Sequence, residues 1–309
     1  MNYILLVVGF LLLIKGADWF VDGSASVAKR LKVPTFIIGM TIVAMGTSAP
    51  ELAVSTAASL KGSNAIAISN VIGSNIFNLL VVCGACALFQ PLSVKYSVLR
   101  KEFPISILAS VLFVAMCFLG FSMSRTDGMI LVLLFVCFLV WMVLSARKAR
   151  EEEEQEEPLK QLPVWKCIIF IPGGIAAIVL GGDLVVDAAS AIAESFGLSP
   201  TLIGLTIVAC GTSLPELVTS IVAAKKGDAD MALGNVIGSN IFNILLILGI
   251  AASVSPMEVL TENLIDGCLL IGLSFVTFVF AWIKQNISRK EGIVMLLLYV
   301  VYLFYICLR

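Results

Sequence analysis

Histidine is absent from this chain of 309 residues, and charged residues make up only 13% of it, against 60% hydrophobic residues. The absence of histidine excludes imidazole metal sites, serine–histidine catalysis and histidine proton relays. A soluble domain carries about 25% charged residues, so this composition, with a mean hydropathy of +1.05, indicates a polytopic membrane protein. The formal net charge of −1 indicates no particular partner, because the charges are segregated along the chain.

The eight cysteines do not form a pattern typical of a metal or redox centre. Cys83 and Cys86 form a C-x-x-C pair inside an apolar run, and no second pair is spaced to complete a zinc site. Others, such as Cys117 and Cys268, also lie in apolar segments. We therefore expect buried free thiols that pack as small apolar side chains, and we expect no cofactor.

Hydropathy predicts ten membrane-spanning helices. A helix needs about 20 residues to cross the hydrocarbon core, and ten apolar segments have suitable lengths. These segments are residues 3–28, 35–60, 64–89, 103–121, 127–146, 166–191, 200–224, 230–253, 264–283 and 291–308. No Lys or Arg precedes the first segment and a basic cluster follows it, so we expect a retained span rather than a signal peptide.

The basic residues lie mainly on one side of the predicted membrane. The connections after spans 1, 3, 5, 7 and 9 hold most of them, whereas the other side holds only Lys61, Arg125 and Arg309. Because basic loops face the cytoplasm, both termini are predicted to lie outside the cytoplasm. We expect a multi-pass protein of the cell membrane, which in a bacterium is the plasma (inner) membrane, with the lipid bilayer as its surroundings and no nucleic-acid partner.

The chain contains an internal repeat. The sequence V-A-M-G-T-S-A-P-E at 43–51 returns as V-A-C-G-T-S-L-P-E at 208–216, and N-V-I-G-S-N-I-F-N at 70–78 returns unchanged at 235–243. Both pairs are separated by 165 positions. Each half has five predicted spans, an odd number, so the second half starts on the opposite side of the membrane. The sequence therefore predicts an all-α integral membrane protein of two inverted five-helix repeats, with a transport site where they meet.

The repeat divides the chain into three parts. Residues 1–146 form the predicted first repeat, 147–165 a cytoplasmic linker and 166–309 the second repeat. The linker contains the acidic run E-E-E-E-Q-E-E at 151–157. One interpretation of this run is a calcium-sensing tail. We favour a solvated linker, because an unstructured acidic run lacks the fixed cage that a selective cation site needs.

Two carboxylates are predicted in the middle of the membrane. Glu51 and Glu216 occupy the centres of spans 2 and 7, where a charged side chain is costly and is usually functional. A static buried ion pair would need a basic partner at the same depth. The only basic residue within the membrane is Lys15, which lies outside both motifs. Both glutamates are therefore expected to face a polar cavity.

Oxygen-bearing side chains accompany each glutamate at helical spacing. Members of these stripes recur every four residues and so share a helix face. The four stripes are Thr47, Glu51 and Ser55; Asn70, Ser74 and Asn78; Thr212, Glu216 and Ser220; and Asn235, Ser239 and Asn243. Gly73 and Gly238, which precede Ser74 and Ser239 in the sequence, would let helix backbones approach closely.

Two prolines are expected to add backbone ligands. Pro50 and Pro215 lack an N–H and clash with the carbonyl four residues earlier, which frees carbonyls near residues 44–46 and 209–211. Carboxylate, amide, hydroxyl and carbonyl oxygens together suit Ca²⁺, and also Na⁺. Zinc or copper would need Cys or His, and Mg²⁺ prefers few protein ligands.

At these residues the chain resembles the sodium/calcium exchangers of the calcium:cation antiporter superfamily. Their two alpha repeats carry G-T-S-x-P-E followed by G-N-x-x-G-S-N-x-x-[ND], and this sequence has matching segments at 46–51, 69–78, 211–216 and 234–243. The resemblance implies that spans 1 and 6 slide across a fixed core. It also implies cation ligands at the carbonyls of Ala44 and Ala209 and at the side chains of Thr47, Ser48, Glu51, Ser74, Asn78, Thr212, Ser213, Glu216, Ser239 and Asn243.

Two positions depart from the family pattern. Ser69 replaces the expected glycine of the first G-N, a change between small residues. Asn243 stands where well-studied members carry Asp, so the site keeps two acidic groups rather than three. The second departure bears on which ion is coupled to Ca²⁺ and on how many ions are carried.

The resemblance implies secondary active antiport of Ca²⁺ against Na⁺, with both ions as competing substrates between Glu51 and Glu216, and no enzymatic reaction. The closest alternative is Ca²⁺/H⁺ antiport, because burial favours the protonated form of a carboxyl group. A cation channel is less favoured, since it usually gathers its pore from identical subunits around an axis. An intramembrane aspartyl protease would need Asp18 and Asp183, which lie toward the ends of spans 1 and 6.

Overall fold

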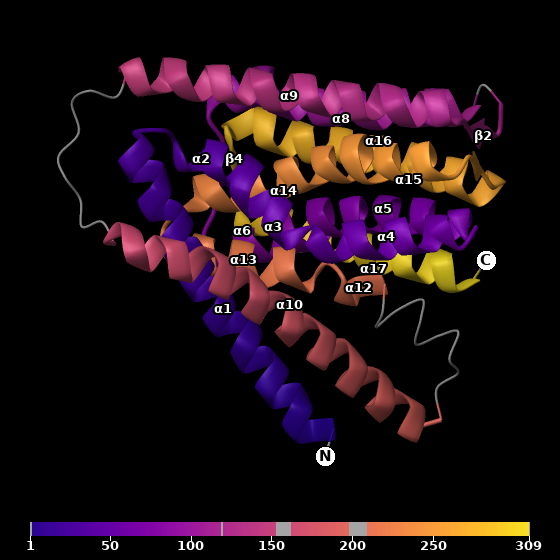
Figure 1. Ribbon diagram of the computed structural model, residues 1–309, viewed down its shortest axis with the longest axis horizontal. Helices are drawn as coiled ribbons and strands as arrows, with labels where there is room; N and C mark the ends of the chain where they lie inside the picture. Colours follow the sequence, from indigo (N-terminus) through magenta and orange to yellow (C-terminus); the bar gives the residue numbers. More distant parts are fainter. Residues whose placement is uncertain (1, 119, 153–161, 198–208, 309) are drawn as a thin grey trace.

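The computed structural model describes residues 2–118, 120–152, 162–197 and 209–308, and these are almost entirely helical (Figure 1). The first half contains α1 (Asn2–Leu31), α2 (Thr35–Ile38), the π-helical segment η1 (Gly39–Val43), α3 (Ala44–Thr47), α4 (Ala49–Leu60), α5 (Asn64–Phe77), η2 (Asn78–Val82), α6 (Cys83–Phe89), β1 (Leu92–Ser93), α7 (Tyr96–Arg100), α8 (Glu102–Phe118), β2 (Ser122–Met123) and α9 (Arg125–Glu152). The second half contains α10 (Val164–Ser195), α12 (Ala209–Gly211), α13 (Leu214–Lys225), α14 (Ala229–Phe242), η4 (Asn243–Leu248), α15 (Gly249–Val254), β3 (Met257–Glu258), α16 (Thr261–Lys284), β4 (Asn286–Ile287) and α17 (Arg289–Leu308).

The described helices account for most of the predicted membrane spans. Eight are long and apolar enough to cross a bilayer, and Thr35–Thr47 with Ala49–Leu60 is a helix pair that is long and apolar enough together, with a bend of 48° between its two parts. The span predicted at 200–224 begins among residues 198–208 and lies partly outside the described residues. The chain is therefore an all-α protein with many membrane spans. Several predicted boundaries differ by a few residues, and the span expected at 103–121 begins earlier, at Tyr96, where Val98 and Leu99 are buried.

Element bounds recur along the chain with the 165-residue offset of the sequence motifs. Helices α4 and α13 correspond residue for residue, as do α5 and α14. The short strands pair between the halves, with β1 antiparallel to β4 and β2 antiparallel to β3. The two halves thus contain the same succession of local structures, and they interleave in space.

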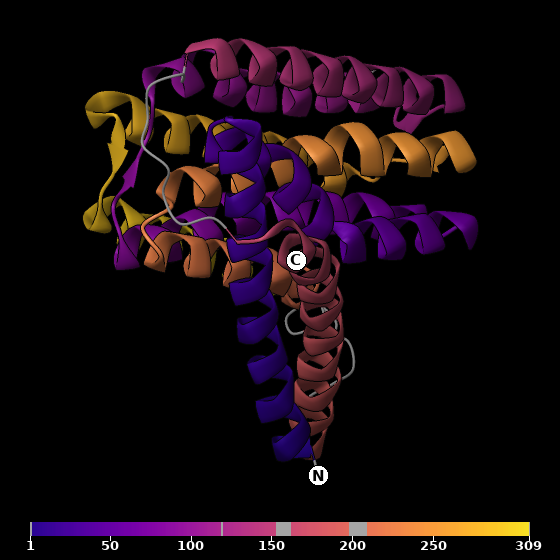
Figure 2. The same cartoon turned by 60° about the vertical axis from the view of Figure 1, so that its left-hand side comes forward.

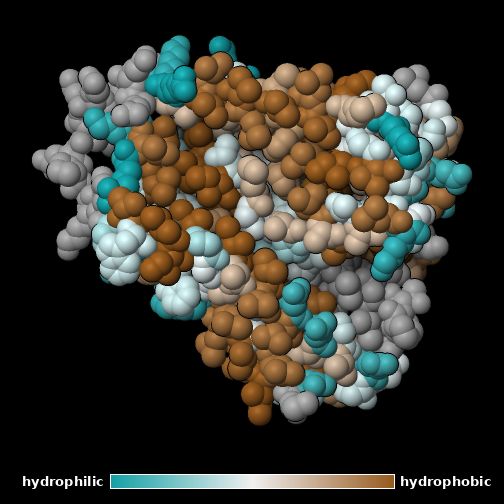
Figure 3. All heavy atoms as spheres, viewed as in Figure 1, coloured by the Kyte–Doolittle hydropathy of each residue, from teal (hydrophilic) through white to brown (hydrophobic). Residues whose placement is uncertain are grey.

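The helices nearest the two motifs lie at the centre of the molecule. In an 18-residue apolar stretch of Ala229–Val254, 83% of residues are buried, whereas in such a stretch of Arg289–Leu308 17% are buried. Helices such as α9 and α17 instead present apolar side chains outward, among them Leu133, Val140, Val301 and Phe304. Figure 3 shows the resulting broad hydrophobic surface. An apolar exterior around a polar centre is the arrangement that a lipid environment stabilises.

Helices α1 and α10 form a pair that projects from the remaining helices, as Figures 1 and 2 show from two directions. Their backbones approach at glycines: a Cβ atom on Gly9 would lie 2.9 Å from the Gly181 carbonyl oxygen, and one on Gly16 would lie 2.9 Å from that of Gly174. Small residues of this kind allow close helix packing in membranes. The crossing is antiparallel, because increasing numbers on α1 meet decreasing numbers on α10.

The acidic connection between the halves is described only at its edges. Helix α9 continues to Glu152, into the run that the sequence analysis assigned to a linker, and α10 begins at Val164. Residues 153–161 lie outside the described residues. The division of the chain into 1–146, 147–165 and 166–309 stays a prediction.

Candidate cation-binding site

Both glutamates stand in the first turn of a short helix at a break in a membrane span. Helix α3 ends at Thr47 and α4 begins at Ala49, so Pro50 occupies the first turn, where its missing N–H is not needed. Pro215 has the same place in α13. The prolines therefore start new helices and do not interrupt a continuous one. Glu51 and Glu216 in turn lie near helix N-termini, where the backbone dipole stabilises negative charge.

The backbone around the first break is largely hydrogen-bonded. The carbonyl of Ala44 accepts from the Ser48 amide at 3.0 Å and from the Thr47 hydroxyl at 3.4 Å. A carbonyl oxygen has two lone pairs, so these contacts limit its capacity as a further ligand. Its counterpart Ala209 is the first residue of α12.

A serine from each half of the chain donates a hydrogen bond to the glutamate of the other half. The Ser48 hydroxyl donates to Glu216 Oε1 at 2.7 Å, and the equivalent Ser213 hydroxyl donates to Glu51 Oε1 at 3.0 Å. Ser74 adds a longer contact of 3.5 Å to Glu51 Oε1. The two G-T-S-x-P-E motifs therefore meet in one buried site.

Several oxygens in the buried centre have no hydrogen-bond partner among the described residues. They are Glu51 Oε2, Glu216 Oε2, Asn78 Oδ1, Asn243 Oδ1 and Ser239 Oγ. The five residues that carry these oxygens are fully buried. Buried acceptors without donors are costly, so a set of carboxylate and amide oxygens left unpaired in this way is suited to a bound cation.

The threonines and outer asparagines form a second layer that is symmetric between the halves. Thr47 Oγ1 donates to Asn235 Oδ1 at 3.1 Å, and Thr212 Oγ1 lies 3.4 Å from Asn70 Oδ1. Asn70 and Asn235 each donate from Nδ2, at 2.9 Å, to a serine hydroxyl on the neighbouring helix: Ser55 and Ser220, respectively. The hydroxyl protons of both threonines are thus engaged, which leaves oxygen lone pairs available.

Asn75 and Asn240 are site residues that were not among those predicted from the sequence. Each donates its amide N–H to the backbone carbonyl of the other, at 3.2 and 3.4 Å. Their side-chain oxygens accept from Asn243 at 2.9 Å and from Asn78 at 3.2 Å, respectively. Because the Nδ2 atoms of Asn78 and Asn243 are engaged in these bonds, their Oδ1 atoms point away from Asn240 and Asn75. The available signal was the unchanged N-V-I-G-S-N-I-F-N motif, which contains Asn75 and Asn240 as its second asparagine.

The electrostatic setting of the site is acidic. No lysine or arginine in the described part of the chain forms an ion pair with Glu51 or Glu216. Lys15, the one basic residue predicted within a span, instead pairs with Asp18 at 2.8 Å. In the described ranges, no three His, Cys, Asp or Glu side chains are placed so that they could hold a metal ion together, so the donor set consists of two carboxylates with neutral oxygens. This composition favours hard cations.

The glycines next to the site differ in their surroundings. A Cβ atom on Gly238 would lie 2.6 Å from the Met40 Cα atom and 2.9 Å from Ala44 Cβ, so close packing of α14 against η1 and α3 requires glycine there. At Gly73, no described atom lies within 4 Å of the Cβ position. The expected close approach is therefore found at Gly238 and not at Gly73 among the described residues.

Comparison with known proteins identifies relatives over nearly the whole chain. A family model described as "Sodium/calcium exchanger protein" matches residues 1–144 and 166–308. The sodium/calcium exchanger MaX1 of Methanosarcina acetivorans is 34% identical and is covered over 97% of its length by 98% of this chain. The putative antiporter CaxA of Alkalimonas amylolytica is 41% identical over 82% of this chain and 81% of its own.

The fold is also similar to solved structures. A structure of the sodium-calcium exchanger NCX_Mj, soaked with zero Na⁺ and Ca²⁺, superimposes with a TM-score of 0.86 and 32% sequence identity. The match covers 99% of this chain and 98% of that one. The similarity therefore includes both copies of the repeated motif and all the described helices around it.

Proposed function

Because the chain belongs to the sodium/calcium exchanger family, we propose that it exchanges Ca²⁺ for Na⁺ at a single site between Glu51 and Glu216. Family membership establishes the broader class, which is a multi-pass membrane antiporter of Ca²⁺ and other cations. The observation that carries the finer proposal is the set of buried oxygens on both glutamates and on Asn78 and Asn243 that lack a hydrogen-bond partner among the residues the structure describes.

Two carboxylates neutralise one Ca²⁺, and the same oxygens can hold Na⁺ in its place. Charges at low dielectric interact strongly, so the site cannot hold the full complement of both ions. Competition of this kind couples the two fluxes if the site changes sides only when it is occupied. The crossed bonds from Ser48 and Ser213 support the proposal, since they fix one oxygen of each carboxylate, and the other oxygen has no hydrogen-bond partner in the described part of the chain.

We further propose that the ten spans form two inverted repeats with both termini outside the cytoplasm. The matching element bounds of the two halves and the crossed strand pairs support this proposal. A pseudo-two-fold axis in the membrane plane would then pass between the glutamates. One framework could in that way open the site to either side in turn.

Proton-coupled exchange is a second candidate, and Asn243 is the observation that favours it. With amides at Asn78 and Asn243, the only acids among the predicted ligands are Glu51 and Glu216. Both carboxyls are fully buried and have no cationic partner in the described part of the chain, so they are the groups that would carry a proton in such an exchange. An aspartyl protease is not supported, because Lys15 and Lys226 engage Asp18 in ion pairs.

Reconstitution separates these candidates. Purified protein in proteoliposomes is given ⁴⁵Ca²⁺ under an outward Na⁺ gradient at equal pH, or under an outward proton gradient without Na⁺. We expect uptake under the Na⁺ gradient and its collapse when Na⁺ is equalised. Uptake driven only by the proton gradient would replace Na⁺ by H⁺ in the proposal, and uptake without either gradient would indicate a channel.

A further inference from the structure

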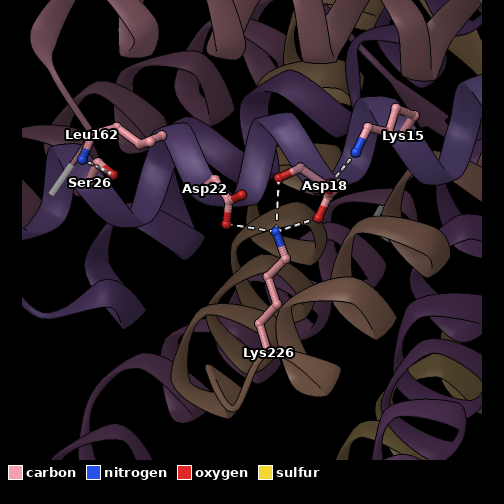
Figure 4. Close-up of polar contacts among 6 residues, drawn as sticks. All are labelled: Lys15, Asp18, Asp22, Ser26, Leu162 and Lys226. Atoms are coloured by element: carbon pink, nitrogen blue, oxygen red, sulfur yellow. Dashed lines mark hydrogen bonds and ion pairs between the residues drawn. The ribbon is translucent and has the colours of Figure 1, made fainter. Parts of the chain in front are cut away.

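Lys226 joins two helices from opposite halves of the chain. It follows α13 directly, and its Nζ atom lies 2.5 Å from Asp18 Oδ1 and 2.6 Å from Asp22 Oδ1 on α1 (Figure 4). The same Nζ donates to the Asp18 carbonyl at 3.1 Å. Lys15 contacts the other Asp18 carboxylate oxygen at 2.8 Å. We name Lys226, Asp18 and Asp22 the α1–α13 cluster.

The repeat places an equivalent set of charges in the other half. At the 165-residue offset, Lys226 corresponds to Lys61, and Asp18 and Asp22 correspond to Asp183 and Asp187 on α10. Lys61 follows α4 directly, as Lys226 follows α13. All three equivalent residues are exposed, and none forms an ion pair with another described residue. We name Lys61, Asp183 and Asp187 the α4–α10 set.

The helix packing shows the same asymmetry as the charges. Helix α1 packs along α13. The repeat-equivalent pair is α10 and α4, and these two helices make no comparable contact. The contact between α1 and α10, in contrast, is symmetric: Gly9 meets Gly181 and Gly16 meets Gly174, and each pair is the repeat equivalent of the other. The α1–α10 pair could therefore move as a unit without losing its own packing.

We propose that the two sets of charges form ion pairs alternately. In the conformation described, Lys226 holds α1 against α13. In the opposite conformation, Lys61 pairs with Asp183 and Asp187 and holds α10 against α4, while Lys226 releases Asp18 and Asp22. This inference rests on the proposed antiport function, because a transporter that alternates between two sides needs both conformations.

The strength of such ion pairs suits this role. The side chains of Lys226, Asp18 and Asp22 are 30%, 33% and 44% exposed, respectively, so water weakens their attraction. Partly exposed ion pairs bias an equilibrium without fixing it. Each set has one lysine and two aspartates, which keeps the two conformations near in free energy apart from Lys15 beside Asp18, whose repeat equivalent is Leu180. A small ligand-dependent difference is then sufficient to shift the population.

The test measures a distance across the α4–α10 set in the full-length protein. Spin labels are placed at Leu60→Cys and Leu180→Cys in a variant with the eight native cysteines replaced, and distances are measured by double electron–electron resonance in nanodiscs without transported ions. Both positions are well exposed, at 69% and 59%, and neither belongs to a charge cluster. We expect two populations, the shorter one corresponding to α10 held against α4.

Neutralising each lysine should shift this distribution in opposite directions. Lys226→Gln should raise the ratio of the short to the long population by about three- to tenfold, and Lys61→Gln should lower it by a similar factor. The matched control is Lys225→Gln, since Lys225 is adjacent in sequence but lies over the Phe89 ring, 4.3 Å from its centre. The control should leave the ratio unchanged, and the double variant Lys61→Gln/Lys226→Gln should return it toward the parent value.

Two results would overturn the proposal. One is a Lys226→Gln distribution identical to that of Lys225→Gln, and the other is a shift of both lysine variants in the same direction. Because all these residues are exposed, monodispersity and an unchanged melting temperature verify that the variants fold. The readout needs no transport. Distances that respond as expected in a protein without Na⁺- or proton-driven Ca²⁺ uptake would refute the proposed function alone, and normal uptake without a distance response would refute the alternating ion pairs alone.

Discussion

The hydroxyl of Ser48 lies 2.7 Å from Glu216 Oε1, although the two residues are 168 positions apart. The repeat-equivalent bond joins Ser213 to Glu51. Each motif thus supplies a carboxylate and the donor that orients the carboxylate of the other motif. The site is complete only when both halves are assembled, which explains why both copies keep the same G-T-S-x-P-E residues.

Removal of either central charge should abolish Ca²⁺ transport. Glu51→Gln or Glu216→Gln leaves a divalent ion half-compensated in a buried site, so we expect ⁴⁵Ca²⁺ uptake to fall by about 100-fold or more. The matched control is Glu102→Gln on α8, which alters a carboxyl outside the site whose buried Oε2 atom likewise has no hydrogen-bond partner among the described residues. Wild-type uptake by a folded Glu51 or Glu216 variant would refute the assigned site.

The crossed serine bonds should contribute to affinity more than to stability. Ser48→Ala and Ser213→Ala each free a carboxylate oxygen from its orienting donor, so the Ca²⁺ concentration for half-maximal uptake should rise by about three- to tenfold. Ser110→Ala is a suitable control, because the Ser110 hydroxyl bonds the Ser106 carbonyl within α8. Equal affinities for all three variants would show that these bonds do not orient ligands.

An added carboxylate should change the dependence on Na⁺. Asn243→Asp places a further negative charge among the buried oxygens, so monovalent ions should bind more tightly, with the Na⁺ dependence of exchange shifted by about three- to tenfold. The variant also loses the 2.9 Å bond to Asn75, so its melting temperature is measured in parallel. Asn78→Asp should behave similarly as the repeat equivalent. Unchanged Na⁺ curves in both variants would remove the second stripe from the site.

The proposed orientation can be tested by labelling. A single cysteine in the 151–157 segment should react with an impermeant maleimide only from the cytoplasmic side, and one at Glu194 only from outside. The eight native cysteines are first replaced, because some of them, including Cys137 and Cys307, are exposed. Labelling of both positions from one side would contradict the inverted arrangement of the halves.

Close helix packing beside the site should depend on Gly238. A methyl group at this position meets the Met40 backbone and Ala44, so Gly238→Ala should destabilise the protein by about 1–3 kcal/mol, measured by thermal unfolding in detergent. Gly272→Ala in α16 is the matched control, because its Cβ would have no described atom within 4 Å. A Gly238 variant as stable as the control would show that α14 can move away from η1 at little cost.

Much of the site could be predicted from residues that are close in sequence. Helical spacing placed Thr47, Glu51 and Ser55 on one stripe, and the structure finds Glu51 and Ser55 buried in the same helix. The prolines were harder to interpret. A clash with the preceding turn was expected, but Pro50 and Pro215 lie in first turns, where no such clash arises. A sequence pattern gives the position of a proline, whereas the helix start that accommodates it depends on the surrounding packing.

The sequence by itself determined the hydrophobic spans, the two equivalent motifs and the oxygen-rich chemistry of the centre, because these follow from composition, period and repetition. Only the tertiary structure decided which residues meet: the crossed Ser48–Glu216 bond, the mutual amide bonds of Asn75 and Asn240, and the contact of Lys226 with α1. Such contacts join helices more than 160 residues apart and depend on how their faces pack. The repeat alone does not determine which of the two lysines, Lys226 or Lys61, forms ion pairs, because both halves contain the same lysine and aspartates. In the conformation described, Lys226 forms them.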